Sequence, residues 1–117
     1  MTRVARVYDA PQPGDGVRAL VDRLWPRGVR KDDPRIDQWW RDLAPSTELR
    51  TWFGHEPARF EEFTARYEEE LAAPAVADLL AHARRVDRSE GLTVLTATKE
   101  LAITHARVLA RVIDQAE

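Results

Sequence analysis

Apolar residues recur along this chain with two different periods, and each period predicts a different kind of element. Short apolar runs in Val17–Leu24 and Leu92–Thr96 predict buried strands of a parallel sheet. Alternating basic and apolar residues in Arg3–Tyr8 predict a further strand. The prolines and glycines of Asp9–Gly16 predict a loop, and Asp87–Gly91 is predicted to be a turn. Each of these two connections leads into a strand.

The segments between the second and third predicted strands show a helical period instead. In Pro57–Leu71, aromatic and aliphatic residues recur at spacings of three and four, and glutamates occupy the other face. Ser46 is a predicted N-cap and Gly54 a predicted helix-ending residue. The other segments predicted to be helical are Ile36–Leu43, Ser46–Gly54, Pro74–Val86 and about Leu101–Gln115.

Strands separated by helices predict an α/β fold, with a small, mostly parallel sheet and helices packed on its faces. No linker, repeat or low-complexity stretch interrupts the chain, so we expect residues 1–117 to form a single domain. The length of 117 residues is that of one ordinary domain with its own hydrophobic core.

Composition narrows the class of protein. Hydrophobic residues make up 44% and charged residues 32% of the chain, as in soluble globular proteins, and no apolar run reaches membrane-spanning length. The absence of cysteine excludes disulfides, thiolate metal sites and cysteine nucleophiles. The first residues lack a hydrophobic signal core, so we expect a cytoplasmic protein. A formal net charge of −2 argues against nucleic acid as a partner.

Polar residues gather where two of the predicted strands end. Asp22, Arg23 and Arg27 lie at the end of the second strand, and Lys99 follows the third. If these strands are parallel neighbours, their carboxyl ends share the edge of the sheet where α/β proteins bind ligands. A guanidinium group meets a phosphate or carboxylate with two hydrogen bonds. The pattern therefore predicts an anion site formed by Arg23, Arg27 and Lys99, which Arg50 could join.

The same residues also admit a structural interpretation, in which Arg23 pairs with Asp22 or Asp9 and fixes the loop. The acid/base candidates are Asp22, His55 and His105. His55 lies in a Gly-His-Glu-Pro turn and is expected to be exposed, whereas His105 is expected to be a partly buried, hydrogen-bonded side chain.

No sequence motif indicates a metal or a cofactor. The spacing of the histidines, without any cysteine, predicts no metal site. P-loop, dinucleotide-binding and nucleophile-elbow motifs are all missing from the sequence, so we expect no cofactor. Whether the protein is an enzyme stays open at this point.

Five stretches of the sequence carry a more specific signal: VDRLWPRG (21–28), WRDLAPSTELR (40–50), WFGH (52–55), FTARYEEEL (63–71) and LTATK (95–99). Together they resemble the domain of unknown function 488 family, in particular its short YeaO-like members. The resemblance implies a compact α/β fold and a cytosolic bacterial protein. It also implies that Arg23, Arg27, Arg50, His55 and Lys99 fall on the polar motif positions of the family.

Two departures from the family pattern bear on activity. Longer relatives carry a cysteine-containing motif ending in Cys-His-Arg after the last strand, whereas Thr104–Ala106 retains only the histidine. Short members usually read Ala-Lys-Asp where this chain has Thr98–Glu100. If the longer relatives are enzymes that use that cysteine, the resemblance implies that this chain cannot share their mechanism.

Two functions remain open from the sequence. The first is binding of a small anionic ligand, phosphate- or nucleotide-like, at the carboxyl edge of the sheet. The alternative is a non-catalytic protein–protein interaction or regulatory module, acting through another protein or as a homo-oligomer. The tryptophan-rich segment 39–52 and the missing nucleophile favour this alternative.

Overall fold

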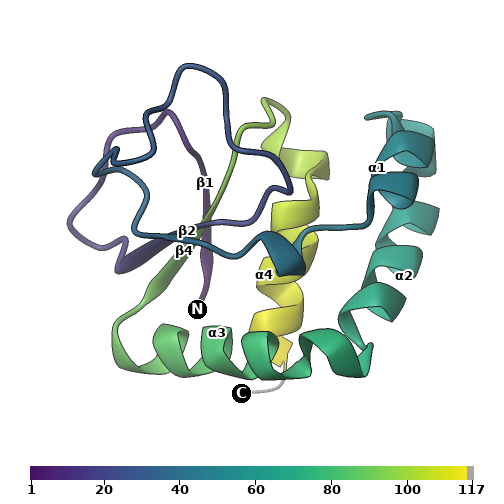
Figure 1. The fold of residues 1–117 in the computed structure, drawn as a ribbon. Coiled ribbons are helices and arrows are strands. Elements are labelled where there is room, and N and C mark those ends of the chain that lie inside the picture. Colours follow the sequence, from purple (N-terminus) through teal and green to yellow (C-terminus); the bar gives the residue numbers. More distant parts are fainter. Residues whose placement is uncertain (116–117) are drawn as a thin grey trace.

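Four parallel strands form the centre of the computed structural model, which describes residues 1–115 (Figure 1). In space they follow the order β1-β4-β2-β3, so the last strand of the sequence lies between the first two. Every residue of that central strand is buried. The strands are β1 (Arg3–Arg6), β2 (Val17–Leu20), β3 (Gln38–Trp39) and β4 (Leu92–Thr96).

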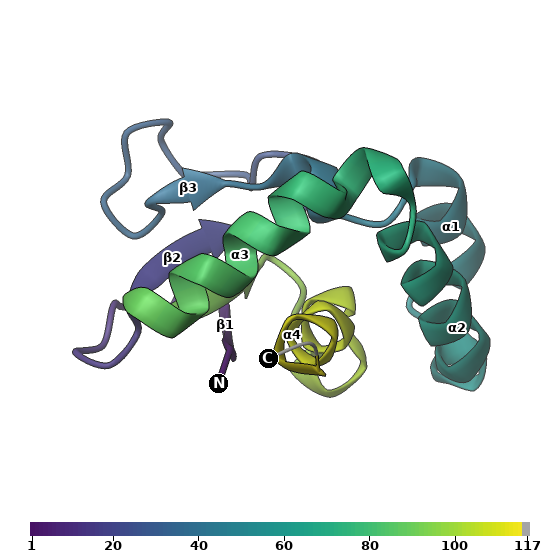
Figure 2. The ribbon, with the colours of Figure 1, turned by 90° about the horizontal axis from the view of Figure 1, so that it is seen from below.

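The helices gather on one side of the sheet. α3 (Ala77–Ser89) and α4 (His105–Gln115) pack against the central strand β4. α2 (Phe60–Leu71) packs against α4, and α1 (Thr47–Phe53) lies beside α2 at the far side of the domain (Figure 2). None of these helices, within the part of the chain that the structure describes, is long and apolar enough to cross a membrane.

Loop residues cover the other face of the sheet. Side chains alternate between the two faces of a strand, so Leu20 and Leu95 point away from the main core that contains their neighbours Ala19 and Val94. These two leucines form a second small core with Val7. Its covering residues come largely from the loops and include Trp25, Ile36, Trp39 and Ala97. The predicted α/β fold with a small parallel sheet is confirmed, and loops supply one of its covering layers.

The helix predicted over Ile36–Leu43 is wrong. This segment contributes strand β3, which pairs with β2, followed by a 3₁₀ turn at Arg41–Leu43. Trp40 donates its backbone N–H to the Leu20 carbonyl at 2.8 Å, which extends the sheet. Trp39 packs on the small core and Trp40 is buried in the main core, as neighbours on a strand do. The spacings of three and four that predicted a helix arise because Ile36 and Trp39 pack on the small core, whereas Trp40 and Leu43 lie in the main core.

Other predicted boundaries also differ, among them those of β2, α3 and α4. β2 ends at Leu20, because the chains diverge beyond Val21 and leave Leu24 63% exposed. The turn predicted from Asp87 is part of α3, which continues to Ser89. The last helix begins only at His105, after a separate 3₁₀ turn.

The predicted caps of α1 are confirmed. The hydroxyl of Ser46 accepts the backbone N–H of Leu49 at 3.1 Å. Gly54 ends the helix in the left-handed conformation, with φ of 53°. These caps fix where the chain turns after α1, which brings the following residue, His55, to the sheet edge described next.

Candidate functional site

A cleft of about 310 Å³ opens at the carboxyl edge of the sheet. One wall is the segment 22–27, which follows β2. A second wall consists of residues 97 and 98, which follow β4, and of Thr104 and His105 at the start of α4. The end of α1 and its connection to the sheet close the remaining side. β2 and β4 are parallel neighbours, which is why their ends meet here. We call this feature the edge cleft.

Asp22 and His105 form the polar floor of the edge cleft. Nε2 of His105 lies 3.0 Å from Oδ1 of Asp22 and 3.1 Å from the Val21 carbonyl oxygen. Both neighbours are acceptors, so Nε2 carries a proton. The other carboxylate oxygen of Asp22 accepts the Ala97 N–H at 2.8 Å. Asp22 thereby connects the ends of β2 and β4 to the first turn of α4.

These contacts set the ionisation of Asp22. Burial acts to raise the pKa of the carboxyl group, whereas the hydrogen bond and charge of His105, the Ala97 N–H and the Thr96 hydroxyl lower it. The lowering contacts prevail, and the pKa lies below its ordinary value. A carboxylate that is ionised and already hydrogen-bonded is a weak general base at neutral pH.

Arg23 joins two segments through neutral partners, and no carboxylate within residues 1–115 pairs with it. Its Nε donates to the Pro45 carbonyl at 3.2 Å, and its Nη2 donates to the Ala44 carbonyl, also at 3.2 Å. Arg23 therefore pairs with neither Asp22 nor Asp9, so the predicted ion pair is wrong. The side chain does hold a loop in place, but through backbone carbonyls. Carbonyl oxygens satisfy two of its donors without neutralising the guanidinium.

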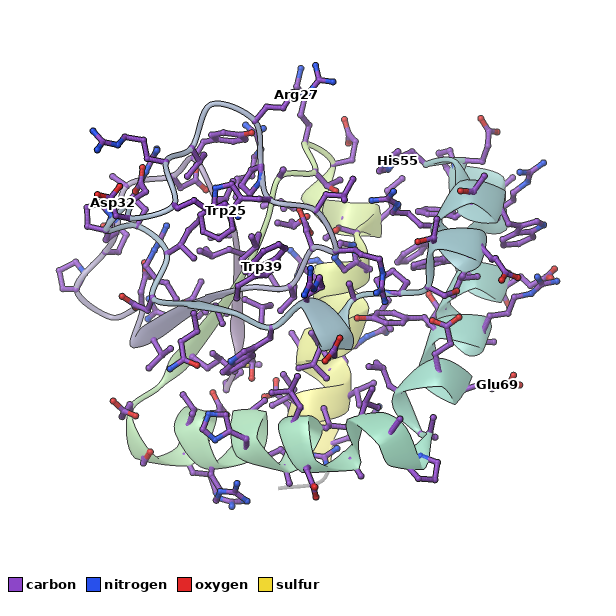
Figure 3. All side chains as sticks on the ribbon, viewed as in Figure 1. Trp25, Arg27, Asp32, Trp39, His55 and Glu69 are labelled. Atoms are coloured by element: carbon purple, nitrogen blue, oxygen red, sulfur yellow. The ribbon has the colours of Figure 1, made fainter. Side chains whose placement is uncertain are left out.

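The other predicted cations differ in position. Arg27 and Arg50 line the edge cleft and are exposed, and within residues 1–115 neither they nor Arg23 form an ion pair. Arg27 lies on the loop after β2 and extends outward (Figure 3). Lys99 is exposed and is not among the residues that line the cleft. The structure thus brings three of the four predicted cations together.

His55 lines the edge cleft in an unusual backbone conformation. Its φ is 58°, and within the described part of the chain no other non-glycine residue has a positive φ. The side chain is exposed, as predicted, and its ring centroid lies 5.9 Å from that of Phe53. Left-handed backbone at a residue with a side chain costs free energy, which is common at functional positions.

Replacing His55 separates backbone strain from side-chain function. We expect His55→Gly to raise the free energy of unfolding by about 0.5–1 kcal/mol, because glycine adopts this φ without steric cost. His55→Ala should instead lower it, since alanine keeps the strain and also loses the contact with Phe53. Urea denaturation measures both, and equal stability of the two variants would contradict the strained conformation.

The sequence patterns do not reveal an apolar wall that the edge cleft contains. They predict Leu24 in a buried strand and Phe53 and Phe63 on the buried faces of helices. Apolar residues next to the arginines are the only sequence signal of such a wall. Residues of this kind indicate a hydrophobic core as readily as a ligand-binding site. The apolar residues that line the cleft are Leu24, Trp25, Pro26, Ala44, Pro45, Phe53, Phe63 and Ala97.

Fold and site together define a small α/β protein with a basic cleft at the carboxyl edge of a parallel sheet. The chain belongs to the family described as the inactive DUF488-N3 subclade, whose pattern matches residues 1–117. The resemblance inferred from the sequence is therefore confirmed at the level of the family.

Relatives of this family match over nearly the whole chain. Uncharacterized protein Rv3073c of Mycobacterium tuberculosis (strain ATCC 25618 / H37Rv) is 50% identical over 112 residues, which cover 96% of this chain and 92% of the relative. Uncharacterized protein YeaO of Escherichia coli (strain K12) is 40% identical over 110 residues, which cover 90% of each chain. No solved structure matches this chain.

Proposed function

We propose that this protein binds a small anionic ligand, phosphate- or nucleotide-like, in the edge cleft and does not turn it over. The observation that carries the proposal is the charge balance of the cleft. Three arginines that form no ion pair within residues 1–115 line it, and Asp22 is the sole carboxylate among the described lining residues. That carboxylate is already held by His105 and Ala97. The local excess of positive charge favours an anion.

Binding without turnover is supported by two further observations. Asp22 has a lowered pKa and is hydrogen-bonded within the fold, so it is poorly suited to act as a base. The description of the family as inactive agrees with this. We also propose a cytoplasmic location, as the resemblance to the family implies.

The alternative of a protein-interaction module is weakened in one of the two observations that favoured it, the tryptophan-rich segment 39–52. Trp40 is 4% exposed and belongs to the main core. The ring of Trp52 is contacted by the guanidinium groups of Arg59 and Arg66. Both rings already have contacts within the chain, which leaves less aromatic surface for a partner.

Titration calorimetry with ribose 5-phosphate tests the proposal. We expect Arg27→Gln and Arg50→Gln each to weaken binding about tenfold, because each removes a charge-assisted hydrogen bond. Binding to the wild type should also weaken as salt is raised. Both arginines are exposed, so the variants should fold normally.

Arg88→Gln is the matched control, since Arg88 is an exposed arginine near the end of α3 and does not line the cleft. It should bind like the wild type. The proposal is wrong if the wild type binds no anion, or if the double variant Arg27→Gln, Arg50→Gln binds as tightly as the control.

A further inference from the structure

We infer that the ligand of the edge cleft carries a flat aromatic ring in addition to its anionic group. This inference rests on the proposed function and specifies its ligand class. It comes from the part of the cleft that the arginines do not explain, namely the apolar wall formed by residues from the loop after β2 and from α1 and α2.

Leu24 is the first sign of an apolar partner. It lines the cleft and is 63% exposed, and it is more exposed than any other leucine within residues 1–115. Exposed apolar area at a concave site is removed from water when an apolar group binds there. A bare inorganic anion would leave this side chain in water.

Aromatic groups on the wall favour a ring over an aliphatic chain. Phe53 and Phe63 line the cleft, and their rings are stacked with centroids 4.4 Å apart. The His55 ring lies next to that of Phe53, and Trp25 belongs to the opposite wall. Phe53 and Phe63 are buried, so the ring surface open to a ligand belongs to the exposed His55 and the partly exposed Trp25, which can pair with another aromatic ring.

The size and layout of the cleft agree with a two-part ligand. A volume of about 310 Å³ is at the small end of the range for small-molecule sites, about 300–1,000 Å³. Arg27 and Arg50 are exposed, whereas Phe53 and Phe63 are buried in the main core below. A ligand would place its ring against the apolar wall and its anionic group toward the arginines.

Calorimetry with four probes tests the inference: inorganic phosphate, ribose 5-phosphate, phenyl phosphate and adenosine 5′-monophosphate. We expect at least one ring-bearing probe to bind about tenfold or more tightly than the two without a ring. Tight binding of phenyl phosphate indicates that any aryl phosphate suffices. A preference for adenosine 5′-monophosphate alone identifies a nucleotide as the source of the ring.

Leu24→Ser provides the matched variant. It changes an exposed side chain on the apolar wall, so the fold should be retained. We expect it to weaken the ring-bearing probes about fivefold and to leave ribose 5-phosphate unchanged, because apolar contact is lost and charge is not. Arg27→Gln should weaken all phosphate probes alike.

The outcomes distinguish the two levels of the proposal. If ribose 5-phosphate binds as tightly as both ring-bearing probes, or Leu24→Ser affects every probe equally, the inference of a ring is overturned while anion binding stands. If no probe binds the wild type, the inference and the proposed function are both overturned.

Tryptophan fluorescence gives a second readout, since a bound ring should quench the emission of Trp25. The change in emission should vanish in Trp25→Phe but persist in Trp52→Phe.

Discussion

Asp22→Asn is expected to lower the free energy of unfolding by about 2 kcal/mol at neutral pH, although the side chain keeps its size. The carboxylate accepts from the Ala97 N–H with one oxygen and faces the protonated Nε2 of His105 with the other. An amide offers only one acceptor to these two donors. One orientation places its NH₂ group against the Ala97 N–H. The other requires Nε2 of His105 to lose its proton and with it the hydrogen bond to the Val21 carbonyl, so one buried hydrogen bond is lost in either case.

The effect of Asp22→Asn should depend on pH. The folded-state pKa of Asp22 lies below the ordinary value of 3.8, so ionisation of this group stabilises the fold above that pH. This contribution is lost as the pH falls through the lowered pKa. The difference in stability between wild type and variant should therefore be largest near neutral pH and shrink below 3.8. Urea titrations at several pH values measure it.

Asp32→Asn is the control for this experiment. Asp32 pairs with Arg30 on the surface, with the two side chains 78% and 85% exposed. Its loss should change stability by less than about 0.5 kcal/mol. Equal stability of Asp22→Asn and wild type across the pH range would mean that the contact between Asp22 and His105 contributes nothing.

Gly16→Ala is expected to be the most disruptive of the glycine-to-alanine substitutions in this chain. Gly16 precedes β2 with φ of 65°, against the turn between α3 and β4. A Cβ atom there would lie 2.3 Å from the Gly91 carbonyl oxygen and 2.6 Å from that of Glu90. Both are backbone atoms, and the Gly91 carbonyl already accepts the Val17 N–H at 3.0 Å. The clash therefore displaces the start of two paired strands.

The left-handed backbone and the clash together predict a loss of about 3–5 kcal/mol for Gly16→Ala. This is a large share of the total stability of a domain, about 5–15 kcal/mol. Gly28→Ala is the matched control, because Gly28 has φ of 75° but no atom lies within 4 Å of the position that an added Cβ would take. It should lose only about 1 kcal/mol. Similar losses in the two variants would show that the clash is relieved by movement.

The parts of the fold that followed from the sequence are those set by local pattern. The bounds of β4 agree with the apolar run 92–96, because a strand buried on both faces needs apolar or β-branched residues throughout. The period of α2 reflects one buried helical face. β3 could not be found this way, since its two residues owe their conformation to pairing with β2.

The candidate site was predictable to the extent that strand ends share an edge. From this rule the sequence predicted that Arg23 and Arg27 lie at the same edge, where they line the cleft. It could not exclude Lys99, because the direction of a loop side chain depends on tertiary contacts. The contact of Asp22 with His105 joins residues far apart in the sequence, and no local spacing indicates it. The apolar wall was missed because an apolar residue beside a strand is usually buried.

The central place of β4 also has a consequence for how the chain folds. Arg3 pairs with Thr93 and Val17 pairs with Leu92, so the main pairings of the sheet join distant parts of the sequence. Within residues 1–115, β1 pairs only with β4, and before β4 is synthesised β2 can pair only with the two-residue strand β3, so the sheet cannot be completed without residues 92–96. Closing such long loops is slow, so we expect this chain to fold more slowly than helical proteins of the same length.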